Sequence, residues 1–315
     1  MTNSRFLLTF GETMALFSTT DPLAYAGQAR VGLGGAESNV AVTVSRLGVD
    51  AHWIGRRGAD SLGDRVERTL RGEGVNVHAI IDPDSSTGLM IKERRSSVAT
   101  NVWYYRDGSA GSRLSKADIP DELVAASGLL HVTGITPLLS PQAREATLHA
   151  VRIARESGVP VSFDINHRQR LAGGIDVVAL YREIARQASI IFASEDEASI
   201  VAPDATDAHS AVLALADLGA SQAIVKLGDA GCVASIDGEI HEVPAVPVNA
   251  VDTVGAGDAF VGGYLARTLQ GAEPSERLDT AVATGAFACT VSGDWEGAPT
   301  ESELAALYST EQVAR

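Results

Sequence analysis

Short apolar runs alternate with amphipathic stretches along most of the chain. Runs that end at Gly, Asp or Ser predict buried strands, and these lie at residues 6–10, 129–132, 159–163, 189–192 and 223–225. Between them, apolar residues recur at helical spacing, at residues 141–157, 176–187 and 208–218. This alternation predicts an α/β fold with a largely parallel central sheet.

Two stretches, residues 12–36 and 86–107, depart from that rhythm. In the second, residues 87–92 and 98–106 resemble paired strands, which predicts a separate small β-sheet. After residue 250 the pattern is helical, and the helices predicted at 257–269 and 277–289 contain many small residues suited to close packing. The expected division is a body of residues 1–11, 37–85 and 108–315 and a β lid of residues 12–36 and 86–107.

Composition and charge restrict the partners of the protein. Its 315 residues carry a formal net charge of −15 with no visible basic patch, which disfavours nucleic acid. Cys232 and Cys289 have no metal-type or redox-type spacing. Residues 1–20 lack the pattern of a signal peptide and no run of about 18 apolar residues occurs. We therefore expect a cytoplasmic protein with no membrane association.

The segment from Asp252 to Gly263, DTVGAGDAFVGG, is the most informative part of the sequence. Gly255, Ala256 and Gly257 have little or no side chain, so their N–H groups can approach an anion at the start of a helix. Asp258 beside them could accept a proton from a hydroxyl while the amides hold the charge of a transferring phosphoryl group. The alternative interpretation is a simple turn with Asp258 as a helix cap.

A second glycine-rich segment, residues 32–41, predicts a loop entering a helix. A dinucleotide loop would follow the first strand directly and carry an acidic residue about twenty positions on, so the context disfavours a Rossmann site. Gly34, Gly35 and Asn39 could instead present backbone and an amide to a polyhydroxylated ligand.

The GG-x-x-x-N segment at Gly34–Asn39 and the DTVGAGDAFVGG segment together resemble the two signatures of the ribokinase-like, or PfkB, carbohydrate kinase family. The resemblance covers the whole chain. It implies a three-layer α/β/α body with a mostly parallel sheet and a small β-sheet lid. It also implies that Gly255, Ala256 and Gly257 form an anion hole and that Asp258 is the catalytic base. No P-loop sequence is present.

Two shorter segments resemble the nucleotide site of that family. Ser194 to Glu197 resembles an N-x-x-E element near magnesium and phosphate, with serine in place of asparagine. Glu197 would act on hydrated Mg²⁺ through water, or alternatively only begin a solvated helix. Lys226 and Gly228 resemble the K-x-G element beside the nucleotide, although Lys226 could also be a surface residue.

The predicted lid contains a segment, Trp103 to Ser112, that resembles 2-keto-3-deoxygluconate kinases, as does Asp164 to Arg168. This resemblance implies that Tyr104, Arg106 and Arg168 meet the substrate. Two guanidinium groups suit the carboxylate of a sugar acid, because they bind it by charge-assisted hydrogen bonds. The alternative is structural: Arg106 would pair with an acid of the lid, and Arg168 with Asp164.

Near the end of the chain, residues 293–299 resemble the closing loop of the same kinases, which implies a substrate contact for Asp294, or else a simple turn. Met90 departs from the resemblance, because related sugar-acid kinases often have tyrosine there. The loss of that hydroxyl leaves the sugar and its C4 epimer open.

Together these features predict an ATP- and Mg²⁺-dependent kinase that phosphorylates the C6 hydroxyl of 2-keto-3-deoxygluconate or a close analogue, with Asp258 as base. The alternatives are a fructokinase or ribokinase of the same fold, a non-catalytic sugar-sensing regulator and an NAD-dependent oxidoreductase. Unpaired edges of the lid favour a homodimer.

Overall fold

The computed structural model describes residues 5–96 and 99–307, and within them strands form two sheets. The large sheet has nine strands in the order β13-β12-β11-β10-β9-β8-β1-β4-β5. Its strands are β1 (Leu7–Phe10), β4 (Ala51–Gly58), β5 (Asn76–Asp82), β8 (Leu129–Thr133), β9 (Val161–Asp164), β10 (Ile190–Ser194), β11 (Gln222–Lys226), β12 (Cys232–Ile236) and β13 (Glu239–Val243).

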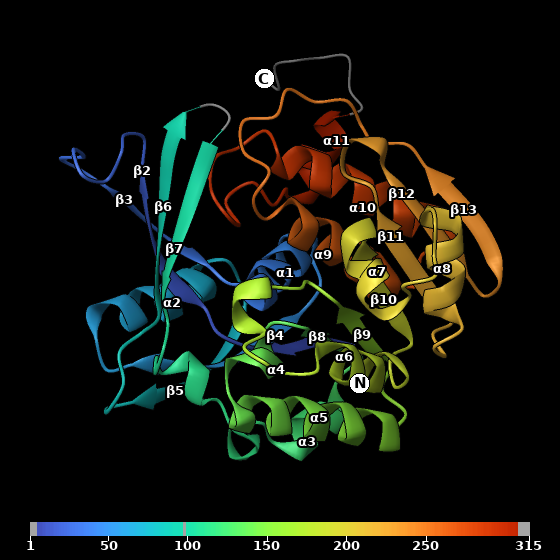
Figure 1. The fold of residues 1–315 in the computed structure, drawn as a ribbon, viewed down its shortest axis with the longest axis horizontal. Helices are drawn as coiled ribbons and strands as arrows, with labels where there is room; N and C mark the ends of the chain where they lie inside the picture. The colour runs from blue at the N-terminus through green and yellow to red at the C-terminus, as the bar shows by residue number, and fades with distance from the viewer. Residues whose placement is uncertain (1–4, 97–98, 308–315) are drawn as a thin grey trace.

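The small sheet has four strands in the order β3-β2-β6-β7, and it stands away from the rest of the molecule (Figure 1). Its strands are β2 (Met14–Thr19), β3 (Arg30–Gly34), β6 (Leu89–Ser96) and β7 (Ala99–Tyr105). The glycine-rich segment 32–34 therefore belongs to strand β3, and the prediction of a loop there is wrong. Pairing with β2 at Leu16↔Gly32 and Met14↔Gly34 makes these glycines part of a ladder.

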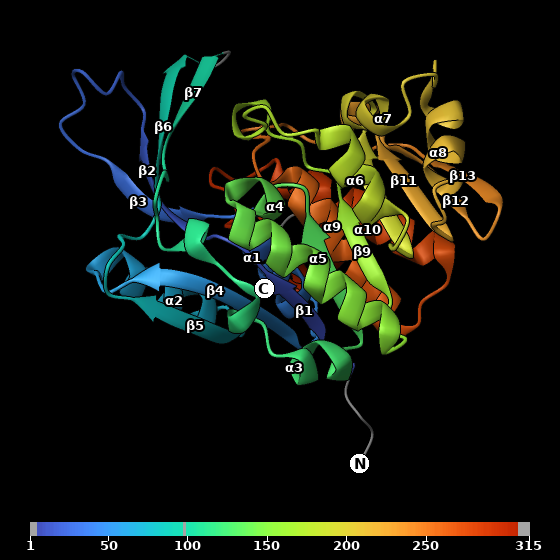
Figure 2. The ribbon, with the colours of Figure 1, turned by 60° about the horizontal axis from the view of Figure 1, so that its bottom comes forward.

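Helices cover both faces of the large sheet (Figures 1 and 2). Cores on its two faces explain why: Leu8 and Ile54 pack on one face, whereas their neighbours Leu7 and Trp53 pack on the other. The first face is covered by α5 (Pro141–Glu156), α6 (Val177–Ala185), α7 (Glu195–Val201) and α8 (Ala208–Ala216). The second is covered by α1 (Ala36–Arg46), α2 (Ser61–Gly72), α9 (Ala256–Gln270), α10 (Pro274–Ala288) and α11 (Glu301–Leu307). The short helices α3 (Asp121–Ala126) and α4 (Thr136–Leu139) flank β8.

The strands β5, β4, β1, β8, β9, β10 and β11 are parallel, and the hairpin β12–β13 continues the sheet in antiparallel fashion. The predicted three-layer α/β/α fold with a small second sheet is confirmed. Because parallel strands end at one edge, the segments that follow β1, β8, β9, β10 and β11 meet there. Among the described residues, no helix has both the length and the apolar character that crossing a membrane requires.

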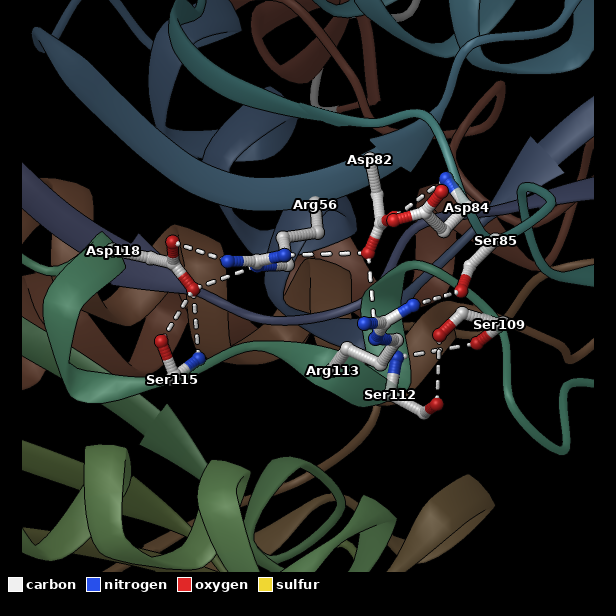
Figure 3. A network of polar contacts seen from close by, with 9 residues as sticks. All are labelled: Arg56, Asp82, Asp84, Ser85, Ser109, Ser112, Arg113, Ser115 and Asp118. Atoms are coloured by element: carbon white, nitrogen blue, oxygen red, sulfur yellow. Dashed lines mark hydrogen bonds and ion pairs between the residues drawn. The ribbon is translucent and has the colours of Figure 1, made fainter.

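A polar network fixes the place where the small sheet joins the large one (Figure 3). Arg56 on β4 donates two hydrogen bonds to Asp118, at 2.8 and 3.0 Å, and one to Asp82 at 3.2 Å. Arg113 also approaches Asp82, at 3.5 Å, and donates to Ser85 at 2.7 Å. Although burial opposes it, hydrogen bonding to Arg56 lowers the pKa of Asp118 below its ordinary value. The chain is thus held both where it leaves β5 and where it returns after β7.

Helix α9 packs closely on α1 and α10 because two adjacent glycines leave room for side chains of its neighbours. A Cβ atom on Gly262 would lie 2.5 Å from Cβ of Thr43 in α1, and Gly263 faces Thr284 in α10. The hydroxyl of Thr284 donates to the carbonyl of Ala259 at 2.9 Å. Close approach of α1 and α9 brings the start of each helix to the same place.

Substitution of Gly262 by alanine tests this contact. We expect Gly262→Ala to lower the free energy of unfolding by about 1–3 kcal/mol, because Thr43 and the backbone must move to admit the methyl group. Gly72 at the end of α2 is the control, since a Cβ there meets nothing within 4 Å. Gly72→Ala should stabilise the protein by about 0.4–1 kcal/mol. Denaturant unfolding measures both, and equal stability of the two variants would contradict the packing argument.

Candidate active site

A cavity of about 1480 Å³ lies between the carboxyl edge of the large sheet, the start of α9 and the inner face of the small sheet. Every residue that the sequence predicted for a site lines this one cavity: Gly34, Gly35, Asn39, Tyr104, Arg106, Arg168, Ser194, Glu197, Lys226, Gly228, Gly255, Ala256, Gly257, Asp258 and Asp294. The structure therefore brings together segments that are far apart in the sequence.

Helix α9 begins at the cavity without a side-chain cap. Its N-cap residue, Gly255, has φ of +79°, a conformation that favours glycine, and a Cβ there would overlap the carbonyl of Asp294. A Cβ on Gly257 would instead meet only Nζ of Lys226, at 3.8 Å. Glycine at 255 is thus required by the turn, whereas glycine at 257 leaves open space beside the N–H groups of the helix start. Such a space suits an anion.

Asp258, in the first turn of α9, is buried and is held by two amides from other elements. Nδ2 of Asn39 in α1 donates to one carboxylate oxygen at 2.7 Å, and Nδ2 of Asn166 after β9 donates to the other at 3.3 Å. Burial raises the pKa of Asp258, although the bond from Asn39 and the charges of Arg168 and Lys226 oppose the rise. The result is a positioned carboxylate whose affinity for a proton is higher than that of an exposed aspartate.

Lys226, at the end of β11, is not a surface residue. Its ammonium donates to both carboxylate oxygens of Asp164, at 2.9 and 3.0 Å. Burial alone would lower its pKa, but attraction to Asp164, Glu197 and Asp258 outweighs burial and raises it. Lys226 therefore remains charged and contributes a fixed positive group to the cavity wall.

Ser194 and Glu197 form a capping box at the start of α7. The Ser194 hydroxyl accepts from the backbone N–H of Glu197 at 3.2 Å, and the Glu197 carboxylate accepts from the N–H of Ser194 at 2.8 Å. The other oxygen of Glu197 accepts from the N–H of His167 at 3.0 Å. The carboxylate is thus fixed in place on the cavity wall and ties β10 to the segment after β9.

Arg106 is buried and forms an ion pair with an acid of the predicted lid segment, as the structural alternative required. Nε of Arg106 donates to Oε2 of Glu12 at 2.7 Å, and Ser109 also donates to Glu12. Its guanidinium carbon lies 5.9 Å from the centre of the Tyr104 ring. Arg168 differs: it is exposed, and the partner suggested for it, Asp164, is bound to Lys226.

Asp294 and Met90 lie against Gly34 of the small sheet. A Cβ atom on Gly34 would overlap the methyl group of Met90 and a carboxylate oxygen of Asp294, so glycine is needed for their approach. Burial raises the pKa of Asp294 to about 7, and attraction to Lys92 opposes that rise. Its Oδ1 has no hydrogen-bond partner among the described residues, which leaves an acceptor beside the cavity.

Three buried polar residues of the cavity were not predicted as site residues: Glu12, Glu37 and Asn166. Glu37 is buried and accepts hydrogen bonds from the hydroxyls of Thr133 and Thr136, both at 2.6 Å. Burial raises its pKa. The sequence pattern could have indicated Glu12 and Asn166, because each lies a short distance after a predicted buried strand, where ligand groups of parallel sheets gather.

The charged groups of the cavity do not form a metal cage. Among residues 5–96 and 99–307, no group of three or more His, Cys, Asp or Glu is arranged to hold a metal ion. A cation that keeps most of its waters and needs only one or two carboxylates fits this site, and Mg²⁺ behaves in that way. Glu197, a carboxylate fixed on the cavity wall, could meet such a hydrated ion.

Comparison with known proteins gives a consistent result. Residues 4–301 match the family described as pfkB family carbohydrate kinase. The chain is 34% identical to 2-dehydro-3-deoxygluconokinase of Bacillus subtilis, over 97% of this chain and 96% of that protein. It is 33% identical to 2-dehydro-3-deoxygalactonokinase of Haloferax volcanii, over 91% and 92%. The crystal structure of a fructokinase with bound ATP from Xylella fastidiosa has a TM-score of 0.86 and 26% identity, over 96% of this chain and 98% of that one.

The two glycines of the α9 start allow a test of the anion site. Gly257→Ala should change the free energy of unfolding by less than about 0.5 kcal/mol, because its methyl group meets open space. It should nevertheless lower kinase turnover about a hundredfold, since the methyl group displaces the bound anion. Gly255→Ala should destabilise the protein instead. Unfolding and steady-state kinetics measure the contrast, and normal turnover of Gly257→Ala would exclude an anion at this position.

Proposed function

Because the chain belongs to the pfkB family of carbohydrate kinases, we propose that it transfers the γ-phosphoryl group of ATP to the C6 hydroxyl of 2-keto-3-deoxygluconate or a close analogue. The observation that carries the mechanism is the setting of Asp258. A buried carboxylate with raised pKa lies in the first turn of a helix whose start is uncapped and open to the cavity. Base and anion site are therefore adjacent.

In this mechanism Asp258 accepts the proton of the C6 hydroxyl as that oxygen attacks the γ-phosphorus, and ADP leaves with the broken P–O bond. Asn39 and Asn166 each donate to one oxygen of the carboxylate, which fixes its orientation in the cavity wall. The N–H groups of residues 255–257 stabilise the negative charge of the transferring group. When bound, Mg²⁺ would neutralise phosphate charge, and Glu197 would orient it through water.

ATP is proposed to bind along the C-terminal half of the cavity. Lys226 and Gly228 follow β11, at the carboxyl edge where open α/β sheets bind ligands. Gly228 has φ of +60° and a Cβ there would meet nothing within 4 Å, so its backbone is open to a ligand. The similarity to a fructokinase structure with bound ATP supports the same nucleotide for this chain.

The sugar acid is proposed to lie between this edge and the small sheet, which would act as a lid. Arg168, exposed on the cavity wall, supplies a guanidinium group with no ion pair to Asp164. Arg106 pairs with Glu12 through Nε and Nη2, and no hydrogen bond of its Nη1 is found in the described part of the chain. Both could therefore bind a carboxylate. The names of the relatives from B. subtilis and H. volcanii, which differ in the C4 epimer, support a keto-deoxy sugar acid.

A neutral sugar is the second candidate substrate, and one observation favours it. The ion pair with Glu12 already neutralises the charge of Arg106, so a carboxylate on the substrate is not needed to balance it. Met90, which offers no hydroxyl, leaves the C4 epimer undecided. A non-catalytic sugar sensor is a remote alternative, because Asp258 and its glycines are intact.

We also propose that two copies associate through the outer face of the small sheet. Trp103 and Tyr105 on β7 are 47% and 62% exposed, and Tyr25 between β2 and β3 is 86% exposed. Large aromatic side chains on an exposed sheet favour association with a second chain. The proposed lid consists of residues 12–36 and 86–107, with the remainder of the chain as body.

The role of Asp258 is tested by Asp258→Asn. The amide keeps the size of the side chain but cannot accept the proton, so kcat should fall about 10²–10⁴-fold while binding of ATP and sugar is retained. In the unsubstituted protein kcat/KM should decrease as pH falls through the raised pKa of Asp258, because the protonated carboxyl is inactive. This acid limb should be absent in the variant. Turnover near that of the parent would remove Asp258 from the role of base.

Substrate class is decided by ADP release with Mg-ATP and 2-keto-3-deoxygluconate, its C4 epimer, fructose, ribose and gluconate. We expect the highest kcat/KM for a keto-deoxy acid. Arg168→Met should lower that value about 10- to 100-fold, since a charge-assisted hydrogen bond to the carboxylate is lost, and should leave any fructose activity unchanged. Arg152→Met on the surface of α5 is the control. Preference for fructose or ribose would establish the neutral-sugar alternative.

A further inference from the structure

Lys92 lies on strand β6 of the small sheet and makes a buried ion pair with the loop that precedes α9. Its Nζ lies 2.6 Å from Oδ2 of Asp252 and 3.8 Å from Oδ1 of Asp294. All three side chains are at most 10% exposed. Because Lys92 has the same inward face as Met90, the contact is made from the side of the sheet that covers the cavity.

Asp252 is the residue through which this contact reaches the anion site. Its Oδ1 accepts from the N–H of Val254 at 3.3 Å, and its Oδ2 accepts from the N–H of Gly293 at 3.4 Å. Its own N–H donates to the carbonyl of Cys289 at 3.2 Å. The carboxylate thus joins the start of the 252–257 loop to the segment at 289–294, and both segments belong to the cavity wall or adjoin it.

Asp294, the second partner of Lys92, contacts the 252–257 loop at Gly255. The backbone carbonyl of Asp294 lies against Gly255, where no Cβ could be accommodated. Asp294 and residues 253–257 line the cavity, whereas Lys92 and Asp252 do not. Lys92 is therefore placed to act on the anion site through its partners and not by touching a ligand.

The Lys92 contact also changes the electrostatics beside the anion-binding loop. Asp252, Asp258 and Asp294 are close enough that Asp252 and Asp258 both raise the pKa of Asp294, while Lys92 lowers it. An ammonium group among these carboxylates offsets repulsion that would otherwise act on any phosphate nearby. An exposed contact between β3 and the same region, Arg30 to Glu296 at 3.6 Å, is more weakly held, because Arg30 is 64% exposed.

We propose that Lys92 is a positioning residue that couples closure of the small sheet over the sugar to the shape of the 252–257 anion-binding loop. When the sheet is closed, the ammonium holds Asp252 and Asp294, and these hold the amides at 255–257 in the arrangement that receives the phosphoryl group. When the sheet opens, this constraint is released. The inference requires the kinase reaction of the family but not a particular sugar.

The test compares Lys92→Met, Lys92→Arg and the double variant Lys92→Met with Asp252→Asn. The single methionine variant should lose roughly 10- to 100-fold in kcat for whichever sugar ranks first, with the KM for ATP changed much less. Lys92→Arg should restore part of the loss. Lys116→Met is the matched control, because Lys116 makes an exposed ion pair with Glu145 away from the cavity, and its kcat should equal that of the parent.

The double variant distinguishes a loss of kcat caused by misplaced loop residues from a loss caused by lower stability. Lys92→Met alone leaves a buried unpaired carboxylate and should destabilise the protein. Asp252→Asn removes that charge and keeps an acceptor for Val254, so the melting temperature should recover while kcat stays low. Recovery of kcat in parallel with stability, or a kcat of Lys92→Met within threefold of the parent, would overturn the proposal.

Amide hydrogen exchange gives a readout that does not depend on which sugar is phosphorylated. Loss of Lys92 should speed exchange in residues 89–93 and 253–257 together, because the contact couples the two segments. Unchanged exchange at 253–257 in Lys92→Met would overturn the coupling, even if no tested sugar is a substrate. If 2-keto-3-deoxygluconate proved not to be a substrate, the exchange experiment would still test the coupling.

Discussion

The buried carboxylate of Asp258 at the start of α9 is the constraint on which the rest of the site depends. An ionised aspartate in a low-dielectric position requires hydrogen-bond donors, and here they come from Asn39 and Asn166, which lie 219 and 92 residues away in the sequence. The fold meets this requirement by packing α1 on α9 and by ending β9 beside them.

Close helix packing and the direction of the parallel strands together place the residues around Asp258. Glycines 262 and 263 let α9 approach α1 and α10, which sets the distance from Asn39 to Asp258. Parallel strands deliver Asn166, Ser194 and Lys226 to one edge of the sheet. The site is rigid where it rests on these elements. Its other wall is the small sheet, which is joined at its base by the network around Arg56 and Asp82.

Positive side chains at the cavity are paired with negative ones. The chain has a formal net charge of −15, and several acids line or adjoin the cavity that is proposed to bind phosphate. Three cations at or beside the cavity wall each pair with an acid: Lys226 with Asp164, Arg106 with Glu12, and Lys92 with Asp252. Because these pairs are buried, removal of one partner leaves an uncompensated charge. Closure of the small sheet over the cavity and the integrity of these pairs therefore depend on each other.

The sequence alone determined the features that rest on local chemistry. Strand and helix alternation follows from the spacing of apolar residues. The proposed anion site follows from Gly255 and Gly257 beside Asp258, since only glycine allows that turn and that open space. All the predicted site residues line one cavity, and Arg168, Ser194, Glu197, Lys226 and Gly228 reach it because they lie at or just after the ends of parallel strands. Residues 51–58 and 61–72, a strand and a helix, were not predicted, and segment 32–34 was assigned to a loop.

Only the tertiary structure decided which charges meet. Arg106 could bind a substrate or an acid of the small sheet, and the structure pairs it with Glu12, 94 residues away. Lys92 and Asp252 are 160 residues apart and belong to different sheets or loops, so no local pattern links them. Pairing of buried charges depends on distance and burial, which spacing along a chain does not contain. The sequence thus named the groups at the site, and the fold selected their partners.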